Sequence, residues 1–283
     1  MIQNDWIEVI PAGGTATFWQ GGGAAPSAQP CHPVTISYGY LLQLFEVTRE
    51  EYALCAEAGI CERPESCDGN GPPPDLEDES RGNHPMQCLT RYQAETYCAW
   101  IHARLPTESE WEYAAAGPTL QCPEGSFFPW QSGEITGAHA NYAGGVNPFQ
   151  DLEPLFSDAG GPTTPVGFFD GSLRNRDEAG WFGGSETFQT VDNSSPFGIY
   201  DLAGNVAEWT ADTWHPDYNG DPPLDGGPWL EDVTFDGVKK GEGWDSDPGG
   251  LTTYYRAPKG PLLTFPTMGF RCAAEIDSVP WRE

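Results

Sequence analysis

Residues 201–209 read Asp-Leu-Ala-Gly-Asn-Val-Ala-Glu-Trp, which places a short glycine-containing loop between two carboxylates. Calcium in proteins takes six to eight oxygen ligands at roughly 2.3–2.6 Å, from carboxylates, backbone carbonyls and waters. A loop with a glycine inside it can turn its carbonyls toward such an ion. The residues alone leave two interpretations open: Asp201 and Glu208 are calcium ligands, or they cap ordinary turns.

Two other stretches carry equally specific local signals. Residues 104–111 read Arg-Leu-Pro-Thr-Glu-Ser-Glu-Trp, and residues 269–272 read Gly-Phe-Arg-Cys. In the first of them, Thr107 and Glu110 stand at the spacing of a capping box, in which each side chain accepts a hydrogen bond from the other residue's backbone. The pattern predicts a short helix that begins after Thr107 and ends at Gly117.

Two more helices are predicted upstream. Thr48 and Glu51 form a second capping box, and the helix should continue to about residue 58, with Gly59 ending it. Thr90 can cap a third helix over Arg91–Ala103, in which the apolar residues share one face. The sequence therefore predicts three short helices in the first half of the chain.

Strands and loops make up most of the rest. Alternating apolar and polar residues predict a strand at residues 6–10, and a second is expected at Val34–Leu42. Residues 61–83 and 168–194 are expected to be loop insertions, and we find no linker that would separate two domains. We expect residues 1–283 to form a single domain with a core of about residues 6–275.

The composition excludes several classes of protein. The 42 Asp and Glu against 13 Lys and Arg give a net charge of −29, which disfavours nucleic acid as a partner. The sequence has no apolar run long enough to span a membrane, and we expect that no leader is present in this chain. The 35 glycines and 27 prolines argue against long helices or a regular sheet.

Eight cysteines point to an oxidising compartment. Four of them, at positions 55, 61, 67 and 88, crowd around a loop rich in proline and glycine. No pair has the spacing of a zinc ribbon, so disulfides are favoured over zinc. The spacing does not determine which of Cys31, Cys55, Cys61, Cys67, Cys88 and Cys122 bond to one another.

Taken in order along the chain, the motifs resemble the formylglycine-generating enzyme (sulfatase-modifying factor) family. The resemblance covers nearly the whole length, at residues 6–13, 46–48, 97–100, 104–115, 197–208 and 269–272. It implies that family's variant of the C-type lectin-like fold, an α+β fold with low regular secondary structure, short helices and small antiparallel sheets. It also implies that Cys98 bonds Cys272.

The resemblance further implies two bound calcium ions, whose ligands are carried over residue by residue. The residues that match the first site are Asn141, Tyr142, Asp158 and Gly160. The residues that match the second are Asp201, Gly204, Val206 and Glu208. Calcium is therefore the expected cofactor of this chain.

The sequence departs from the family at the catalytic centre. The family's enzymes bind copper(I) through two cysteines, because a thiolate pair is the soft ligand set that selects this ion. Here the two positions fall near Ser246 and near Gly250 or Leu251, and no cysteine lies between Cys122 and Cys272. We therefore expect no catalytic residues at these positions, and copper is not an expected cofactor.

Two hypotheses follow. The first is a non-catalytic, calcium-stabilised, extracytoplasmic (periplasmic or secreted) binding or scaffold module for a peptide, glycan or protein ligand. Its candidate ligand-binding residues are Trp181, Trp244, Tyr254, Tyr255 and Arg256. The alternative interpretation of any one of them is a core residue. The second is an enzyme. It would be either a divergent oxidoreductase that uses cysteines from the 55–88 cluster to convert a target cysteine of sulfatases to formylglycine, or a catalyst of another oxidation in the same cleft.

Overall fold

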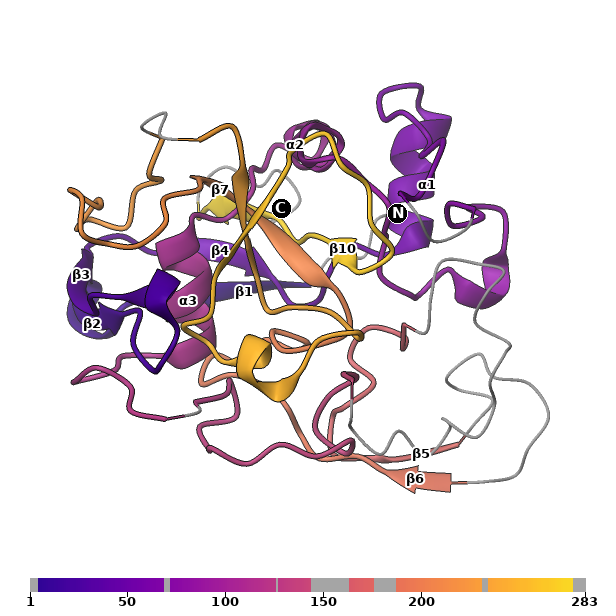
Figure 1. The fold of residues 1–283 in the computed structure, drawn as a ribbon. Coiled ribbons are helices and arrows are strands. Elements are labelled where there is room, and N and C mark those ends of the chain that lie inside the picture. Colours follow the sequence, from indigo (N-terminus) through magenta and orange to yellow (C-terminus); the bar gives the residue numbers. More distant parts are fainter. Residues whose placement is uncertain are drawn as a thin grey trace.

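The computed structural model describes residues 5–68, 72–125, 127–143, 163–175, 187–230 and 234–276. Within these residues the fold is α+β, with short helices and small sheets joined by long irregular segments (Figure 1). The α-helices are α1 (Arg49–Glu57), α2 (Arg91–Trp100) and α3 (Glu108–Ala116). The 3-10 helices are η1 (Ala12–Gly14), η2 (Pro26–Ala28), η3 (Glu79–Arg81) and η6 (Pro248–Leu251).

Two sheets and two hairpins contain the strands. One sheet has the order β1-β4-β11, and the other has the order β10-β7-β8-β9, in which β10 and β7 are parallel. The hairpins are β2-β3 and β5-β6. The strands of the first sheet and of the hairpins are β1 (Trp6–Val9), β4 (Tyr40–Gln43), β11 (Ala273–Glu275), β2 (Ala16–Gln20), β3 (His32–Ile36), β5 (Leu173–Asn175) and β6 (Thr187–Gln189). Those of the second sheet are β7 (Ala207–Thr213), β8 (Gly237–Lys240), β9 (Ala257–Lys259) and β10 (Met268–Gly269).

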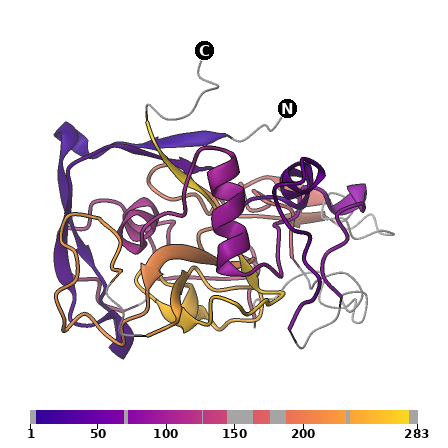
Figure 2. The ribbon, with the colours of Figure 1, turned by 90° about the horizontal axis from the view of Figure 1, so that it is seen from above.

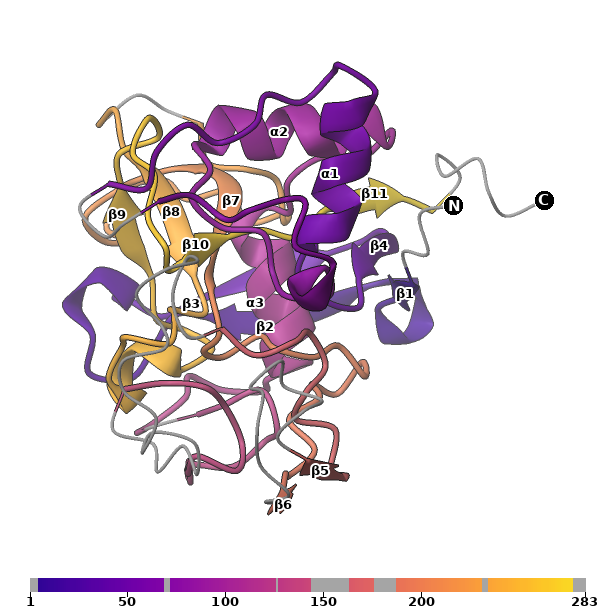
Figure 3. The same cartoon turned by 90° about the vertical axis from the view of Figure 1, so that its right-hand side faces the viewer.

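Helix α3 lies between the two sheets (Figure 3). Every one of its residues is buried, and its aromatic side chains pack with those of β1, β4 and the β2-β3 hairpin. A second core cluster joins α1 and α2 to β7 and β10 through Tyr52, Tyr97, Trp209 and Met268. From above, the indigo N-terminal strands run along one edge of the molecule (Figure 2).

All three predicted helix starts are confirmed. Thr48, Thr90 and Thr107 each form a complete capping box with the residue three positions later. Helix α1 ends at Glu57, close to the predicted residue 58, and α3 ends before Gly117, which has a φ of 73°. These ends were readable because they depend on contacts within one turn of helix.

Two predicted boundaries are wrong. Helix α2 ends at Trp100 rather than Ala103, since the chain turns at His102, which has a left-handed φ of 58°. The strand expected over Val34–Leu42 is two strands, β3 and β4, with a bend at Tyr38 between them. The two halves pair with different partners, β2 and β1 respectively, which requires the chain to change direction.

The eight cysteines form four disulfides, Cys31–Cys122, Cys55–Cys61, Cys67–Cys88 and Cys98–Cys272. The last of these is the pairing that the resemblance implies, and it joins α2 to the segment before β11 across a sequence separation of 174. In the part of the chain that the structure describes, no helix has the length and apolar character needed to cross a membrane.

Candidate functional site

A cleft of about 850 Å³ lies where three distant segments meet. They are residues 22–31 between β2 and β3, residues 122–125 after α3, and residues 249–255, which begin within η6 and lead toward β9. Of the predicted ligand-binding residues, Tyr254 and Tyr255 line this cleft together. The fold therefore brings two of the predicted residues to one concave surface.

A glycine loop forms one wall of the cleft and allows a close approach to Tyr254. Gly21, Gly22 and Gly23 all have positive φ, and a Cβ on Gly23 would lie 2.2 Å from the Tyr254 ring. The Tyr254 hydroxyl donates a hydrogen bond of 2.8 Å to the carbonyl of Gly125, in the 122–125 segment that lies against this loop. Tyr254 is almost completely buried, so it forms the floor of the cleft, while Tyr255 is only half-buried.

The Cys31–Cys122 disulfide is part of the same wall. Both of its cysteines are half-buried, and it joins the 22–31 loop to the 122–125 segment. The cysteines of the 55–88 cluster, which sequence reasoning offered for a divergent oxidase, do not line the cleft and are bonded to one another. None of the chain's eight cysteines, all of which are described, is free.

The positions that match the family's catalytic cysteines carry other contacts. The Ser246 hydroxyl donates a hydrogen bond of 3.0 Å to Glu242, which also forms an ion pair with Lys239 at 2.6 Å. No histidine contacts Ser246 in the described residues, so the arrangement of an activated serine is not formed there. Leu251 is fully buried and Gly250 packs against Glu242, so neither offers a reactive group.

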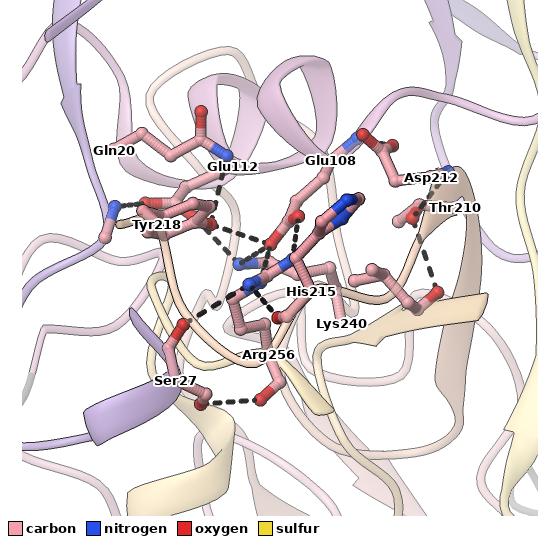
Figure 4. A network of polar contacts seen from close by, with 12 residues as sticks. Gln20, Ser27, Glu108, Glu112, Thr210, Asp212, His215, Tyr218, Lys240 and Arg256 are labelled. Carbon is pink, nitrogen blue, oxygen red and sulfur yellow. Dashed lines mark hydrogen bonds and ion pairs between the residues drawn. The ribbon is translucent and has the colours of Figure 1, made fainter. Parts of the chain in front are cut away.

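Arg256, a predicted ligand contact, is buried and does not line the cleft. Its side chain points toward Glu108 on α3 (Figure 4). Its guanidinium forms a two-bond ion pair with Glu108, at 2.7 and 2.9 Å, and donates to the carbonyl of His215 at 2.8 Å. It also stacks over the rings of Trp214 and Tyr218. A guanidinium with this many partners is not available to a ligand in the cleft.

The surrounding charges complete a buried group that we call the Glu108 network: Glu108, Glu112, Asp212, Lys240 and Arg256. Lys240 pairs with Glu112 at 2.8 Å, and the other Glu112 oxygen accepts from the backbone of Gly21 in the cleft loop. Burial alone would raise the pKa of Glu108, but the charges of Arg256 and Lys240 outweigh it and lower that pKa. Burial, followed by the charge of Glu108, raises the pKa of Asp212 to about 7.

The predicted second calcium site lies in another buried group, which we call the Asp201 cluster: Glu46, Asp201, Glu208 and Arg271. Glu208 accepts three hydrogen bonds, two from Arg271 at 2.7 and 2.8 Å and one from the Trp111 indole at 2.9 Å. Asp201 accepts from the backbone of Gly167 at 2.5 Å. Burial and then the Asp201 charge raise the pKa of Glu46 well above its usual range.

The Asp201 cluster carries an excess of negative charge, as a cation site does, but only one of its six carboxylate oxygens lacks a hydrogen bond among the described residues. Three carboxylates face one guanidinium, and Glu46 Oε2 is buried with no hydrogen-bond partner among the described residues. In the described ranges, no three His, Cys, Asp or Glu side chains are grouped so that they could hold a metal. A calcium ion here would therefore depend on the carbonyls of Gly204 and Val206 as well as on carboxylates.

The residues of the two predicted calcium sites adjoin each other. The backbone N–H of Asn205 donates to the carbonyl of Asn141 at 2.9 Å, and a Cβ on Gly204 would lie 2.4 Å from the same oxygen. Tyr142 is also buried here. Asp158 and Gly160 of the first site, and Trp181 of the predicted ligand surface, lie outside the described residues.

Trp244, another predicted ligand-binding residue, is not among the residues that line the cleft. Its backbone N–H donates to the carbonyl of Asn205 at 3.0 Å, and its indole donates to the carbonyl of Pro266 at 3.2 Å. Sequence reasoning missed the glycine loop at residues 21–23 and the Cys31–Cys122 wall. Three consecutive glycines were the available signal, since such a run permits backbone conformations that other residues rarely adopt.

Comparison with known proteins gives a consistent result. The family model described as "Sulfatase-modifying factor enzyme 1-like domain" matches residues 5–276. Mouse formylglycine-generating enzyme is 28% identical over 205 residues, which cover 71% of this chain and 47% of that protein. Mouse inactive C-alpha-formylglycine-generating enzyme 2 is 29% identical over 191 residues, which cover 67% of this chain and 49% of that protein.

The same fold is seen in PvdO from Pseudomonas aeruginosa, with a TM-score of 0.67 and 25% identity over 96% of this chain and 94% of that one. By contrast, the alignments cover about half of each mouse relative. The family match nevertheless extends over almost all of the present sequence, from β1 to β11. This chain belongs to the formylglycine-generating enzyme (sulfatase-modifying factor) family.

Proposed function

We propose that this chain is a non-catalytic, calcium-stabilised binding module of its family that acts outside the cytoplasm. The main observation that supports the proposal is that the described structure contains no free thiol. All eight cysteines are in disulfides, and the two positions that match the copper-binding cysteines hold other residues. The family also includes a mouse relative named inactive. Four disulfides support an oxidising location.

The proposed ligand site is the cleft above the Glu108 network. Its walls are held by the Cys31–Cys122 disulfide and by the hydrogen bond of Tyr254 to Gly125, so the surface is formed before a ligand arrives. The half-buried Tyr255 offers an amphipathic side chain to the ligand. Peptide, glycan and protein ligands all fit this chemistry.

Mass spectrometry of a Cys-x-Pro-x-Arg peptide tests the non-catalytic part of the proposal. The peptide is incubated with the purified protein, copper(I) and oxygen, with the Mycobacterium tuberculosis formylglycine-generating enzyme as the positive control. We expect the peptide to remain unchanged with this chain while the control converts it. Conversion by this chain would overturn the proposal.

One observation favours the alternative of a divergent oxidoreductase. The Cys31–Cys122 disulfide lines the cleft, and its reduction would place two thiols beside Tyr254 and Tyr255. The same peptide assay is therefore repeated after mild reduction, with a Cys31→Ser, Cys122→Ser double variant as the control. Conversion that requires both cysteines would establish the alternative and identify its thiols.

A further inference from the structure

A second hollow, of about 490 Å³, lies away from the cleft, between the end of α1, the start of α2 and the loop at residues 260–264. We call it the α1–α2 groove. Ile60, Tyr92 and Leu262 line it and remain 52%, 49% and 61% exposed. Single exposed apolar residues are common on protein surfaces, whereas these three line the same hollow and together offer a small apolar surface to a ligand.

The walls of the α1–α2 groove are held rigidly. The Cys55–Cys61 disulfide fixes the turn that carries Ile60, and the Cys67–Cys88 disulfide fixes the segment that follows. The 260–264 loop is attached to both sides, because Arg91 N–H donates to the carbonyl of Pro261 at 3.0 Å and Thr264 N–H donates to Asp68 at 2.7 Å. A groove built in this way loses little conformational entropy when a ligand binds.

The charged residues that line the groove determine whether it favours a cationic or an anionic ligand. Glu62 and Glu65 line it, and no ion pair involves either carboxylate in the part of the chain that the structure describes. The single basic residue of the lining, Arg63, is already paired with Glu77 at 3.0 Å. The first turn of α2 is closed by its own capping box, so its N–H groups do not attract an anion. The groove therefore favours a cationic ligand.

We propose that the α1–α2 groove binds a basic amphipathic peptide segment of a partner protein. An aliphatic side chain of the segment lies between Ile60, Tyr92 and Leu262, and flanking lysines or arginines pair with Glu62 and Glu65. The net charge of −29 adds a long-range attraction for such a partner. This site is separate from the cleft and does not depend on the function proposed for it.

The test uses a short fluorescein-labelled peptide of alternating leucine pairs and lysine pairs, titrated with the full chain and followed by fluorescence anisotropy. We expect an Ile60→Ser, Leu262→Ser double variant to weaken binding by about tenfold or more, since two apolar contacts are lost. Leu224→Ser is the matched control, because Leu224 is 54% exposed and lies outside the groove. It should leave the affinity unchanged.

The charges are tested with a Glu62→Gln, Glu65→Gln double variant, which should weaken binding and flatten its dependence on salt. Four exposed side chains are involved in the two double variants, so the thermal unfolding temperature should not change. An affinity that the groove variants leave at the wild-type value, or equal binding of a twin peptide with glutamate in place of lysine, would overturn the proposal. Binding of phosphatidylcholine vesicles that the Ile60→Ser, Leu262→Ser variant abolishes would overturn it in favour of a lipid surface.

Discussion

The Glu108 network and the Asp201 cluster are both buried, and in each an arginine makes two bonds to one glutamate. The two groups differ in the balance between negative and positive charges. The Glu108 network has three carboxylates against two cations, and all six carboxylate oxygens have hydrogen-bond partners within the chain. The Asp201 cluster has three carboxylates against one cation, and Glu46 Oε2 has no partner among the described residues.

This difference leads us to expect that the chain alone satisfies the Glu108 network, whereas the Asp201 cluster would be completed by protons or by a bound cation. A buried charge is tolerated only when it is paired or loses its charge. In the Glu108 network a single proton on Asp212, whose pKa is raised to about 7, would remove the remaining negative charge. In the Asp201 cluster two carboxylates remain beyond the one that Arg271 balances, and burial raises the pKa of both Glu46 and Asp201, so either two protons or a divalent cation would complete the cluster.

Arg271→Met should have the largest effect on stability. It leaves Glu208 buried with only the Trp111 indole as a partner, and the expected loss is about 3–5 kcal/mol of unfolding free energy in calcium-free buffer. Arg256→Met should cost less, because Lys240 lies 4.0 Å from the abandoned Glu108. Urea unfolding of both variants measures the difference. A greater loss for Arg256→Met would contradict the assignment of the two groups.

Calcium removal should affect the Asp201 cluster alone. An ion that binds only the folded chain stabilises it by about 2.7 kcal/mol when its concentration is 100-fold above Kd. We therefore expect thermal unfolding at a lower temperature in chelator than in calcium, and Asp201→Asn should abolish that response. Asp212→Asn is the control and should retain it. An unfolding temperature that is equal with and without calcium would mean that protons complete the cluster instead.

The sequence was most informative where structure depends on neighbours along the chain. Capping at Thr48, Thr90 and Thr107 involves residues three positions away, so the helix starts were predictable. By contrast, the complete burial of α3 could not be predicted from the sequence. Glu108, Glu110 and Glu112 look like solvated residues until the fold supplies Arg256, Arg104 and Lys240 as partners. The first and last of these partners lie more than a hundred residues away.

In the candidate site, too, the contacts between residues that are distant in sequence could not be predicted. Tyr254 and Tyr255 were predicted from a family position, and the structure places them in the cleft. Arg256 is adjacent in sequence but faces the core, because the backbone turns its side chain toward Glu108. The opposite wall comes from segments that are joined by a disulfide across a sequence separation of 91, and no local pattern indicates that pairing.

The proton held by Asp212 can be tested by pH. Its pKa in the folded chain is about 7, above the value of about 3.9 in an unfolded chain. Between these values only the folded chain binds the proton, so this contribution to stability falls as the pH rises through about 7. From about pH 5 to about pH 8, Asp212→Asn should therefore gain about 2–3 kcal/mol relative to the unsubstituted chain.

Urea unfolding of both proteins at each pH measures that gain. The pKa of Glu51 is also raised to about 7, by burial, but Glu51 is present in both proteins and its effect cancels in the difference. A difference between the two proteins that does not vary with pH would show that Asp212 is ionised throughout. The Glu108 network would then carry a permanent negative charge. The two groups would differ only in how much uncompensated negative charge each of them holds.

Ser27→Ala should have the smallest effect. The Ser27 hydroxyl donates to the carbonyl of Arg256 at 3.2 Å, while the Ser27 carbonyl, which the substitution keeps, accepts from the Arg256 guanidinium. One partly exposed hydrogen bond is lost, so we expect a loss of about 0.5–1 kcal/mol in urea unfolding. The calcium response and the pH dependence should not change. A change in either would mean that the cleft loop helps to hold Arg256 in place, and that the Glu108 network responds to what the cleft binds.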